Sequence, residues 1–274
     1  MKKILLGINT LTEVNQAAYL NHMILSYRLG RSYRSYDFGI CCPRRMQIDN
    51  MRNFCAKAAI DGGFDYLWFL DDDVLLQADC LRHLLDLRSD IAAGITLIRG
   101  YPYNPMLFSF DKKRRNGSSL VEYQKLLKKS EDNSIRKPIL DAVGFSCCLI
   151  NTKLLRKVEP PWFLTGPNFT EDVFFCQRAL TFKKDLTVAA TGHVMTEHLL
   201  GTESISPMNR SARIAYDRVL NPSLLKLGHG AAGVLNVDPN AERYANIRGA
   251  MLARTFRPET SNRAHRAHAG GPND

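Results

Sequence analysis

A continuously apolar segment at residues 66–70 runs directly into three aspartates, Asp71, Asp72 and Asp73. A strand is apolar on both sides when both faces of its sheet are covered, as in parallel α/β proteins. In such sheets, ligands bind in the crevice at the carboxyl ends of the strands. The segment therefore predicts a buried central strand that delivers three carboxylates to a binding edge.

Three adjacent carboxylates repel one another and raise each other's pKa unless a cation is present. Mg²⁺ and Mn²⁺ take oxygen ligands, often one or two carboxylates together with substrate phosphates. One interpretation is a metal site that holds a diphosphate. The alternative is an acidic turn that caps a helix beginning near Gln77.

The first 100 residues alternate between strand-like and helix-like patterns, which indicates βαβ units and a parallel sheet. The expected strands are 4–8, 36–42, 66–70 and 91–97, and the expected helices are 13–29, 47–60 and 78–87. Gly62 and Gly63 follow the second helix, where glycine suits a left-handed C-terminal cap. The fold class predicted is α/β with a mostly parallel central sheet.

After Gly100 the pattern changes, because prolines and then a basic segment interrupt it. Further on we expect a buried strand at 144–151, a short helix at 153–158, a helix at 170–180 capped by Thr170, an extended segment at 186–195 and a helix at 208–227. From about Arg254 large apolar side chains are too few to pack, which predicts a disordered tail.

The formal net charge is +10, and nine Lys/Arg against three acids lie between Lys112 and Lys137. This basic segment suits an anionic partner such as phosphates, nucleic acid or a membrane surface, or it is a solvated loop. The seven cysteines include no CxxC pair, so neither a zinc site nor a disulfide framework is expected. We expect buried thiols, a cytoplasmic location and no transmembrane segment.

Three later features have a functional and a structural interpretation. Glu171 and Asp172 could deprotonate a hydroxyl, or they complement the dipole of the helix that they open. His193 or His198 could complete a metal site, or either has a structural hydrogen-bonding role. Arg52 could pair with a phosphate or a base edge, or it forms a surface salt bridge.

The order of these segments resembles family 2-like glycosyltransferases with the glycosyltransferase A fold, of the kind found in phages, large viruses and bacteria. The segments are MQIDNMRNFCAKAAIDGGFDYLWFLDDDVLL, DIAAGITLIRGYPYNP, AVGFSCCLINTKLL, PWF, TEDVFFCQRAL and HVMTEHLLG. The resemblance implies one Rossmann-like catalytic domain over 1–205, with a nucleotide-binding half at 1–100 and an acceptor half at 101–205. A helical extension at 206–228 and a flexible basic tail at 229–274 would follow.

The resemblance also implies roles for individual residues. The family's D-x-D motif falls on Asp71 and Asp73, so Asp73 is the expected ligand of Mn²⁺ or Mg²⁺, and Asp71 holds the ribose or a metal-bound water. Asp172 corresponds to the catalytic base, and its neighbour Glu171 could take that role. His198 is expected to bind the metal, with His193 as the alternative. Asn9 and Thr10 are expected to contact the nucleobase, and Arg52 and Asp72 the nucleotide. The segment from Gly144 to Cys147 is expected to line the donor and acceptor pocket.

The implied activity is metal-dependent transfer of a sugar from a nucleotide-sugar, expected to be a UDP-sugar, to an acceptor hydroxyl with inversion of configuration. The acceptor is expected to be a glycan or another macromolecule, and hydroxymethyl-pyrimidine DNA of a phage stays open. A viral protein of this kind would act in the host cytoplasm. The rival interpretations are a metal-dependent nucleotidyl or phosphoryl transferase, and a non-catalytic nucleic-acid-binding module.

Overall fold

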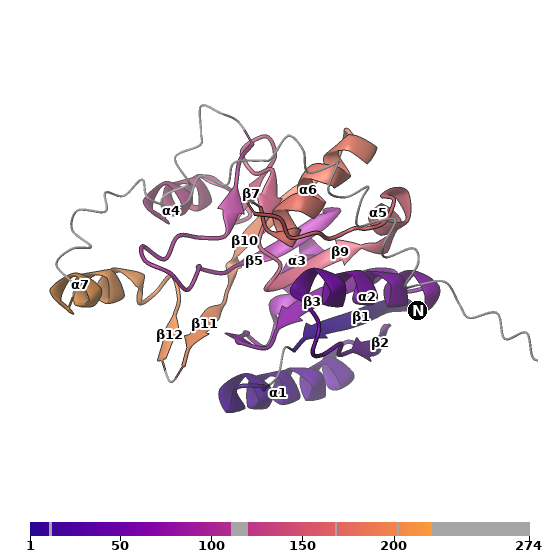
Figure 1. The fold of residues 1–274 in the computed structure, drawn as a ribbon, viewed down its shortest axis with the longest axis horizontal. Coiled ribbons are helices and arrows are strands. Elements are labelled where there is room, and N and C mark those ends of the chain that lie inside the picture. The colour runs from indigo at the N-terminus through magenta and orange to yellow at the C-terminus, as the bar shows by residue number, and fades with distance from the viewer. Residues whose placement is uncertain (11–12, 111–119, 168, 202, 221–274) are drawn as a thin grey trace, which may run out of the picture.

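The computed structural model describes residues 1–10, 13–110, 120–167, 169–201 and 203–220. Its centre is a seven-stranded sheet with helices on both faces (Figure 1). The order across the sheet is β2-β1-β3-β9-β5-β10-β7. In chain order these strands are β1 (Lys2–Asn9), β2 (Tyr36–Cys41), β3 (Tyr66–Asp71), β5 (Ile91–Ile95), β7 (Ser134–Arg136), β9 (Cys147–Asn151) and β10 (Val188–Met195).

Five of the seven strands point the same way, so the predicted mostly parallel α/β sheet is confirmed. β1 pairs in parallel with β2 and β3, and β5 pairs in parallel with β10. β9 lies between β3 and β5 and is antiparallel to both, and β7 is antiparallel to β10. Because β9 runs in reverse, its beginning at Cys147 meets the end of β3 at Leu70.

Alternate residues of β3 belong to two separate hydrophobic cores. Leu67 and Phe69 pack in the core shared with α2 (Ile48–Asp61), α5 (Thr152–Lys157) and α6 (Glu171–Phe182). Trp68 and Leu70 pack in the core shared with α1 (Gln16–Ser32) and α3 (Cys80–Asp86). Covering of both faces explains why this strand is continuously apolar.

Two small antiparallel sheets extend the binding edge. β4 (Val74–Leu75), β11 (Glu197–Leu200) and β12 (Glu203–Ile205) form one, and β6 (Leu107–Phe108) pairs with β8 (Ala142–Val143) in the other. The three aspartates therefore lead into β4. They do not cap a helix near Gln77, since α3 begins at Cys80 with Asp79 at its N-cap position. The acidic-turn alternative is wrong for this reason.

The expected helices and strands are present, with shifted ends. The helix expected at 13–29 begins later because the Asn15 side chain caps it by accepting a 2.8 Å hydrogen bond from the Ala17 N–H. Gly63 has the left-handed conformation expected after α2, with φ of +65°. α4 (Leu120–Lys129) lies within the basic segment, and α7 (Arg210–Leu220) is the described part of the helix expected at 208–227. The predicted tail lies outside the described residues.

All seven cysteines are free thiols, and all except Cys42 are buried, as the sequence predicts. Within the described ranges, every helix is too short or too polar to cross a bilayer.

Candidate active site

A cavity of about 880 Å³ lies at the edge of the sheet where β1 and β3 end. Both the strand ends and the segments that lead into α2 and α6 contribute to its wall. Its polar lining includes Asn9, Asp49, Arg52, Asp71, Asp72, Asp73, Arg99, Ser146, Thr170, Glu171, Asp172 and His198. The sheet topology thus brings together most of the residues that the sequence predicts for the site.

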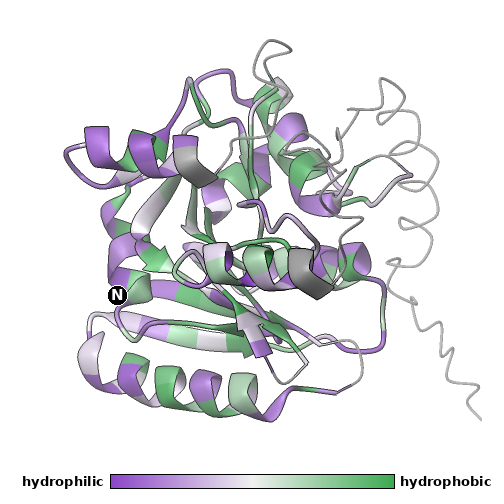
Figure 2. Cartoon of the chain, turned by 90° about the vertical axis from the view of Figure 1, so that its left-hand side faces the viewer, coloured by the Kyte–Doolittle hydropathy of each residue, from purple (hydrophilic) through white to green (hydrophobic). Residues whose placement is uncertain are grey.

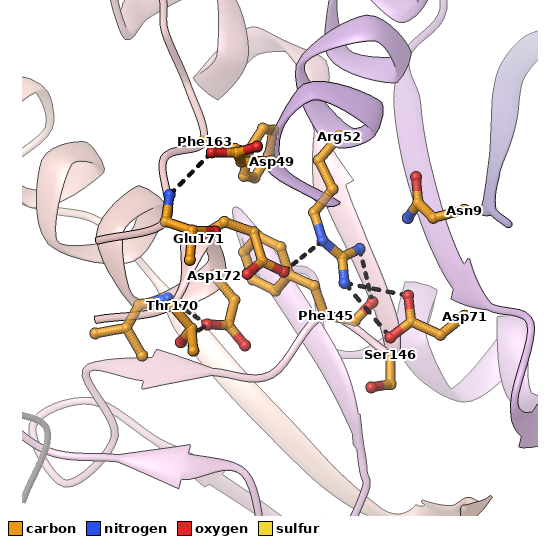
Figure 3. Close-up of polar contacts among 12 residues, drawn as sticks. Asn9, Asp49, Arg52, Asp71, Phe145, Ser146, Phe163, Thr170, Glu171 and Asp172 are labelled. Carbon is orange, nitrogen blue, oxygen red and sulfur yellow. Dashed lines mark hydrogen bonds and ion pairs between the residues drawn. The ribbon is translucent and has the colours of Figure 1, made fainter. Parts of the chain in front are cut away.

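Arg52 is buried at the centre of the site and joins three elements (Figure 3). Its Nε donates to Glu171 Oε1 of α6 at 2.8 Å, and its Nη2 donates to Asp71 Oδ1 of β3 at 3.1 Å. The guanidinium also lies 4.8 Å from the ring centre of Phe69. Burial lowers the pKa of Arg52, but the two carboxylates raise it more, so the side chain stays charged.

This environment excludes one of the two interpretations of Arg52, the surface salt bridge. The side chain is 3% exposed, so it does not form a surface salt bridge. Its Nε and Nη2 are engaged by carboxylates, and Nη1 contacts the Phe145 carbonyl at 3.4 Å. Arg52 therefore acts first as a clamp that holds Asp71 and Glu171 in place.

Asp172 is buried beside Arg52 and accepts two hydrogen bonds. One comes from the Val173 N–H at 2.7 Å, and the other comes from the Thr170 hydroxyl. Burial, followed by the charge of Glu171, raises the pKa of Asp172 to about 7. A carboxylate with a pKa near neutrality is suited to exchange protons with a bound hydroxyl.

The prediction that Thr170 caps α6 is correct in position but wrong in mechanism. Thr170 is the N-cap residue, yet its side chain makes no hydrogen bond to the backbone of the helix. Its hydroxyl donates to the Asp172 carboxylate instead. Thr170 therefore orients the side chain of Asp172.

Asp73 and His198 meet at the mouth of the cavity, although 125 residues separate them. The backbone pairing of β4 with β11 brings them together, since Leu199 N–H donates to the Asp73 carbonyl at 2.8 Å. His198 Nδ1 lies 2.7 Å from the Leu97 carbonyl, which only accepts, so Nδ1 carries a proton. His198 Nε2 then faces Asp73 Oδ2 at 3.3 Å.

Arg99 completes this corner of the cavity, and the sequence analysis did not identify it. Its Nη1 lies 3.0 Å from Asp73 Oδ2, and its side chain is 60% exposed. Burial raises the pKa of Asp73, but the hydrogen bond from His198 and the charges of His198 and Arg99 lower it more. Asp73 is therefore an ionised carboxylate surrounded by positive or neutral nitrogen groups.

Asp72 differs from its two neighbours. Burial raises its pKa to about 6, and the charges of Asp73 and Asp71 add to that effect. The Thr10 side chain hydrogen-bonds to Asp72. Thr10 itself is not among the residues that line the cavity, although its neighbour Asn9 and its partner Asp72 are.

Asn9 lies at the end of β1 and lines the cavity. It is 3% exposed, and among the described residues its side-chain Nδ2 has no hydrogen-bond partner. A buried amide left without a partner is costly, which favours a ligand that accepts its hydrogen bond.

Gly144 and His193 are also absent from the cavity wall. A Cβ atom on Gly144 would collide with the side chain of Met106, so this position needs glycine for packing; Ser146 lines the cavity instead. His193 is exposed and stacks on His83, with ring centres 4.8 Å apart. Of the two candidate histidines, only His198 is part of the cavity wall.

Two polar residues of α2, Asp49 and Asn53, were missed by the sequence analysis. Asp49 accepts from Thr165 N–H at 3.1 Å, and Asn53 accepts from Trp162 N–H at 2.9 Å. They fix the loop that leads into α6. Arg52 and Asn53 follow Asp49 by three and four residues, a spacing that places both on the same helix face as Asp49. This spacing is the signal that could have identified them.

Within the described parts of the chain, no group of three or more His, Cys, Asp or Glu side chains is arranged to hold a metal. The structure brings Asp73 and His198 together, whereas Asp71 turns toward Arg52. Of the three expected metal ligands, Asp73 and His198 lie together, and Asp71 does not join them.

No protein-family model and no curated protein matches this chain. Among solved structures, A197 from STIV has a TM-score of 0.51 and 16% sequence identity, covering 76% of this chain and 91% of that chain. S. aureus TarS in complex with UDP-GlcNAc has a TM-score of 0.36 and 14% identity, covering 93% and 73%. A glycosyltransferase involved in the glycosylation of the major capsid of PBCV-1 has a TM-score of 0.31 and 11% identity, covering 78% and 98%. The likeness to A197 shows a shared fold, and no argument below rests on the other two.

Proposed function

We propose that this protein is a glycosyltransferase of the glycosyltransferase A type that transfers a sugar from a UDP-sugar to an acceptor hydroxyl. One observation carries the proposal, namely the lining of a single cavity of about 880 Å³. It combines an amide nitrogen of Asn9 that has no partner among the described residues, an acidic corner at Asp73, and the buried carboxylate of Asp172 with a pKa of about 7. Cavities of about 300–1,000 Å³ are typical of small-molecule sites. The three groups match the three parts of the reaction, namely nucleobase, diphosphate and acceptor.

The acidic corner suits a divalent cation. With Nδ1 of His198 protonated, its Nε2 either carries a second proton or points a lone pair at Asp73 Oδ2. In the second case a cation is needed to bind both atoms. Two ligands of one octahedral ion of about 2.1 Å bond length lie about 3 Å apart, close to the 3.3 Å between these atoms. Asp73 and His198 thus fit Mn²⁺ or Mg²⁺, which would supply Lewis-acid stabilisation of the charge on the diphosphate.

The other groups at this edge would position the donor. Asn9 Nδ2 would donate to a carbonyl of the nucleobase, because it lacks any other acceptor among the described residues. Asp71, held by Arg52, would accept from the ribose. Arg99 is exposed at the mouth and would pair with a phosphate oxygen.

Asp172 would act as the general base. It would take the proton of the acceptor hydroxyl as that oxygen bonds to the anomeric carbon. The bond from this carbon to the diphosphate oxygen breaks at the same time, and its electron pair leaves with the diphosphate. Attack on the face opposite the leaving group inverts the anomeric configuration.

The donor is tested by measuring UDP release from a panel of UDP-sugars with Mn²⁺, in wild type and in Asp172→Asn. We expect release with at least one donor and a loss of 10²–10⁴-fold in the variant, the range typical of a general base. Adding glycans, and separately hydroxymethylated DNA, with mass spectrometry of the products, identifies the acceptor. Release of UDP from none of the donors under any metal would contradict the proposal.

A further inference from the structure

Helix α1 has two apolar faces, and only one of them packs on the sheet. Its inner face, which includes Leu25 and Leu29, is buried in the core shared with α3. At about 100° per residue the opposite face carries a second apolar stripe. Its members are 51–64% exposed: Tyr19, Leu20, Met23, Ile24 and Tyr27.

No described element covers this outer stripe. α1 forms the lower boundary of the molecule in both overall views (Figures 1 and 2). Clustered exposed apolar residues of this kind mark interaction sites, whereas single exposed residues are normal. The stripe follows the spacing of an amphipathic helix that binds through its outer face.

The segment that holds α1, residues 14–36, carries charge of one sign. Arg28, Arg31 and Arg34 are exposed at the C-terminal end of α1, and residues 14–36 contain no Asp or Glu. Arg31 also donates to the Tyr27 hydroxyl at 2.8 Å, which places its charge against the stripe. An apolar stripe with arginines and no acids is complementary to an anionic, partly apolar surface.

A second copy of the chain fits this surface poorly. The stripe is about 12 Å long and about 10 Å wide, far short of the roughly 800 Å² per partner of a stable interface. Packing two copies would also bring arginines together with no acids to pair them. The chain beyond Leu220 carries seven Lys/Arg against four Asp/Glu, so it has the same sign as α1 and is not the complementary partner.

We propose that the outer face of α1 docks on an anionic lipid surface. The apolar stripe would enter the boundary between headgroups and acyl chains, and the arginines would pair with lipid phosphates. The tyrosines at both ends of the stripe suit this boundary, because their rings are apolar and their hydroxyls stay hydrated. The N-cap residue of α1, Asn15, donates to the Gly201 carbonyl, which follows the strand that carries His198. Docking of α1 would therefore hold the cavity close to the membrane. The proposal does not depend on the proposed transferase activity.

The test is co-sedimentation of the full chain with vesicles of phosphatidylcholine alone or with about one third phosphatidylserine. We expect binding to the anionic vesicles only, and weaker binding at high salt. The double variant Leu20→Glu, Ile24→Glu should bind at least tenfold more weakly. The variant Met208→Glu changes a more exposed apolar residue outside α1 and should bind like wild type.

A second measurement reports on contact with the acyl chains. Tyr27→Trp should be quenched by brominated lipids in anionic vesicles, and Tyr216→Trp on α7, which is similarly exposed, should not. Absence of vesicle binding, or equal binding by the double glutamate variant, would overturn the proposal. Dimerisation of wild type that the double variant abolishes, without vesicle binding, would also overturn it and assign the stripe to a second copy.

Discussion

Asp172 owes its raised pKa to burial and to the charge of Glu171. A general base acts only in its ionised form, so kcat/KM should rise about tenfold per pH unit below about 7 and level off above it. In Glu171→Gln the neighbouring negative charge is absent, and the midpoint should move to lower pH. Rate profiles of both proteins at constant ionic strength check this. An unchanged midpoint in the variant would exclude Asp172 as the titrating group.

The raised pKa of Asp172 also lowers the free energy of unfolding at neutral and higher pH. The pKa of Asp172 is higher in the folded protein than the 3.8 of an unperturbed Asp, so the folded state binds more protons between those values. Stability is therefore lost as pH rises through the window from about 4 to about 7. Asp172→Asn should raise the free energy of unfolding on the order of 1–2 kcal/mol at pH 8 and have little effect at pH 4. Urea denaturation at both pH values tests this; equal effects at both would contradict it.

At the scale of single residues, the sequence identifies groups whose chemistry is local. Asp73 follows the end of a strand, and Asp172 lies in the first turn of a helix. Both positions can be predicted from the neighbouring residues in the sequence. The roles of Arg52 and Gly144 could not be read in this way. They depend on Asp71, Glu171 and Met106, which only tertiary packing brings near.

At the scale of elements, Arg52 links α2 to β3 and α6 through two carboxylates. Arg52→Met would leave Glu171 and Asp71 without the guanidinium that pairs with them. Removing one partner of a buried ion pair lowers the free energy of unfolding by about 3–5 kcal/mol. The matched control is Arg82→Met, whose exposed pair with Asp79 should be worth less than about 1 kcal/mol. Chemical denaturation measures both. Equal losses in the two variants would show that the clamp adds nothing to stability.

α1 also holds the segment that follows the three aspartates. Asn21 accepts from Leu76 N–H at 2.9 Å and donates to its carbonyl at 3.0 Å, so its amide holds the backbone of the residue that follows β4. Asn21→Ala should free this segment and lower the affinity for Mn²⁺ roughly tenfold, as loss of an outer support of a metal ligand does.

The control for Asn21 is Gln16→Ala, an exposed substitution on the same helix. Titration of Mn²⁺ in the presence of UDP compares the two variants. If both lower the affinity equally, the contact of Asn21 with Leu76 is not the cause.

The elements themselves were largely predictable, but their directions were not. Apolar periodicity locates β3 and α2 within one or two residues, since both are buried on a regular pattern. The reversal of β9 could not be read, because a buried strand has the same composition in either direction. That reversal brings Ser146 to the cavity in place of Gly144.

At the scale of the whole molecule, one sheet edge collects groups from distant parts of the chain. β1 supplies Asn9, the loop after β3 supplies Asp73, and the start of α6 supplies Asp172. The ribbon formed by β4 and β11 adds His198. The fold therefore brings these groups to one cavity. Our central proposal is that this cavity binds a base, a diphosphate and an acceptor.

Calorimetric titration of UDP, with and without Mn²⁺, tests that claim most directly. Wild type should bind UDP tightly only when Mn²⁺ is present, because Asp73 and His198 would hold the cation that the diphosphate needs. Asp73→Asn should lose this dependence together with most of the affinity, whereas Asp172→Asn should bind like wild type, since its carboxylate acts on the acceptor. Failure of wild type to bind UDP with any divalent cation, or unchanged binding in Asp73→Asn, would contradict the account.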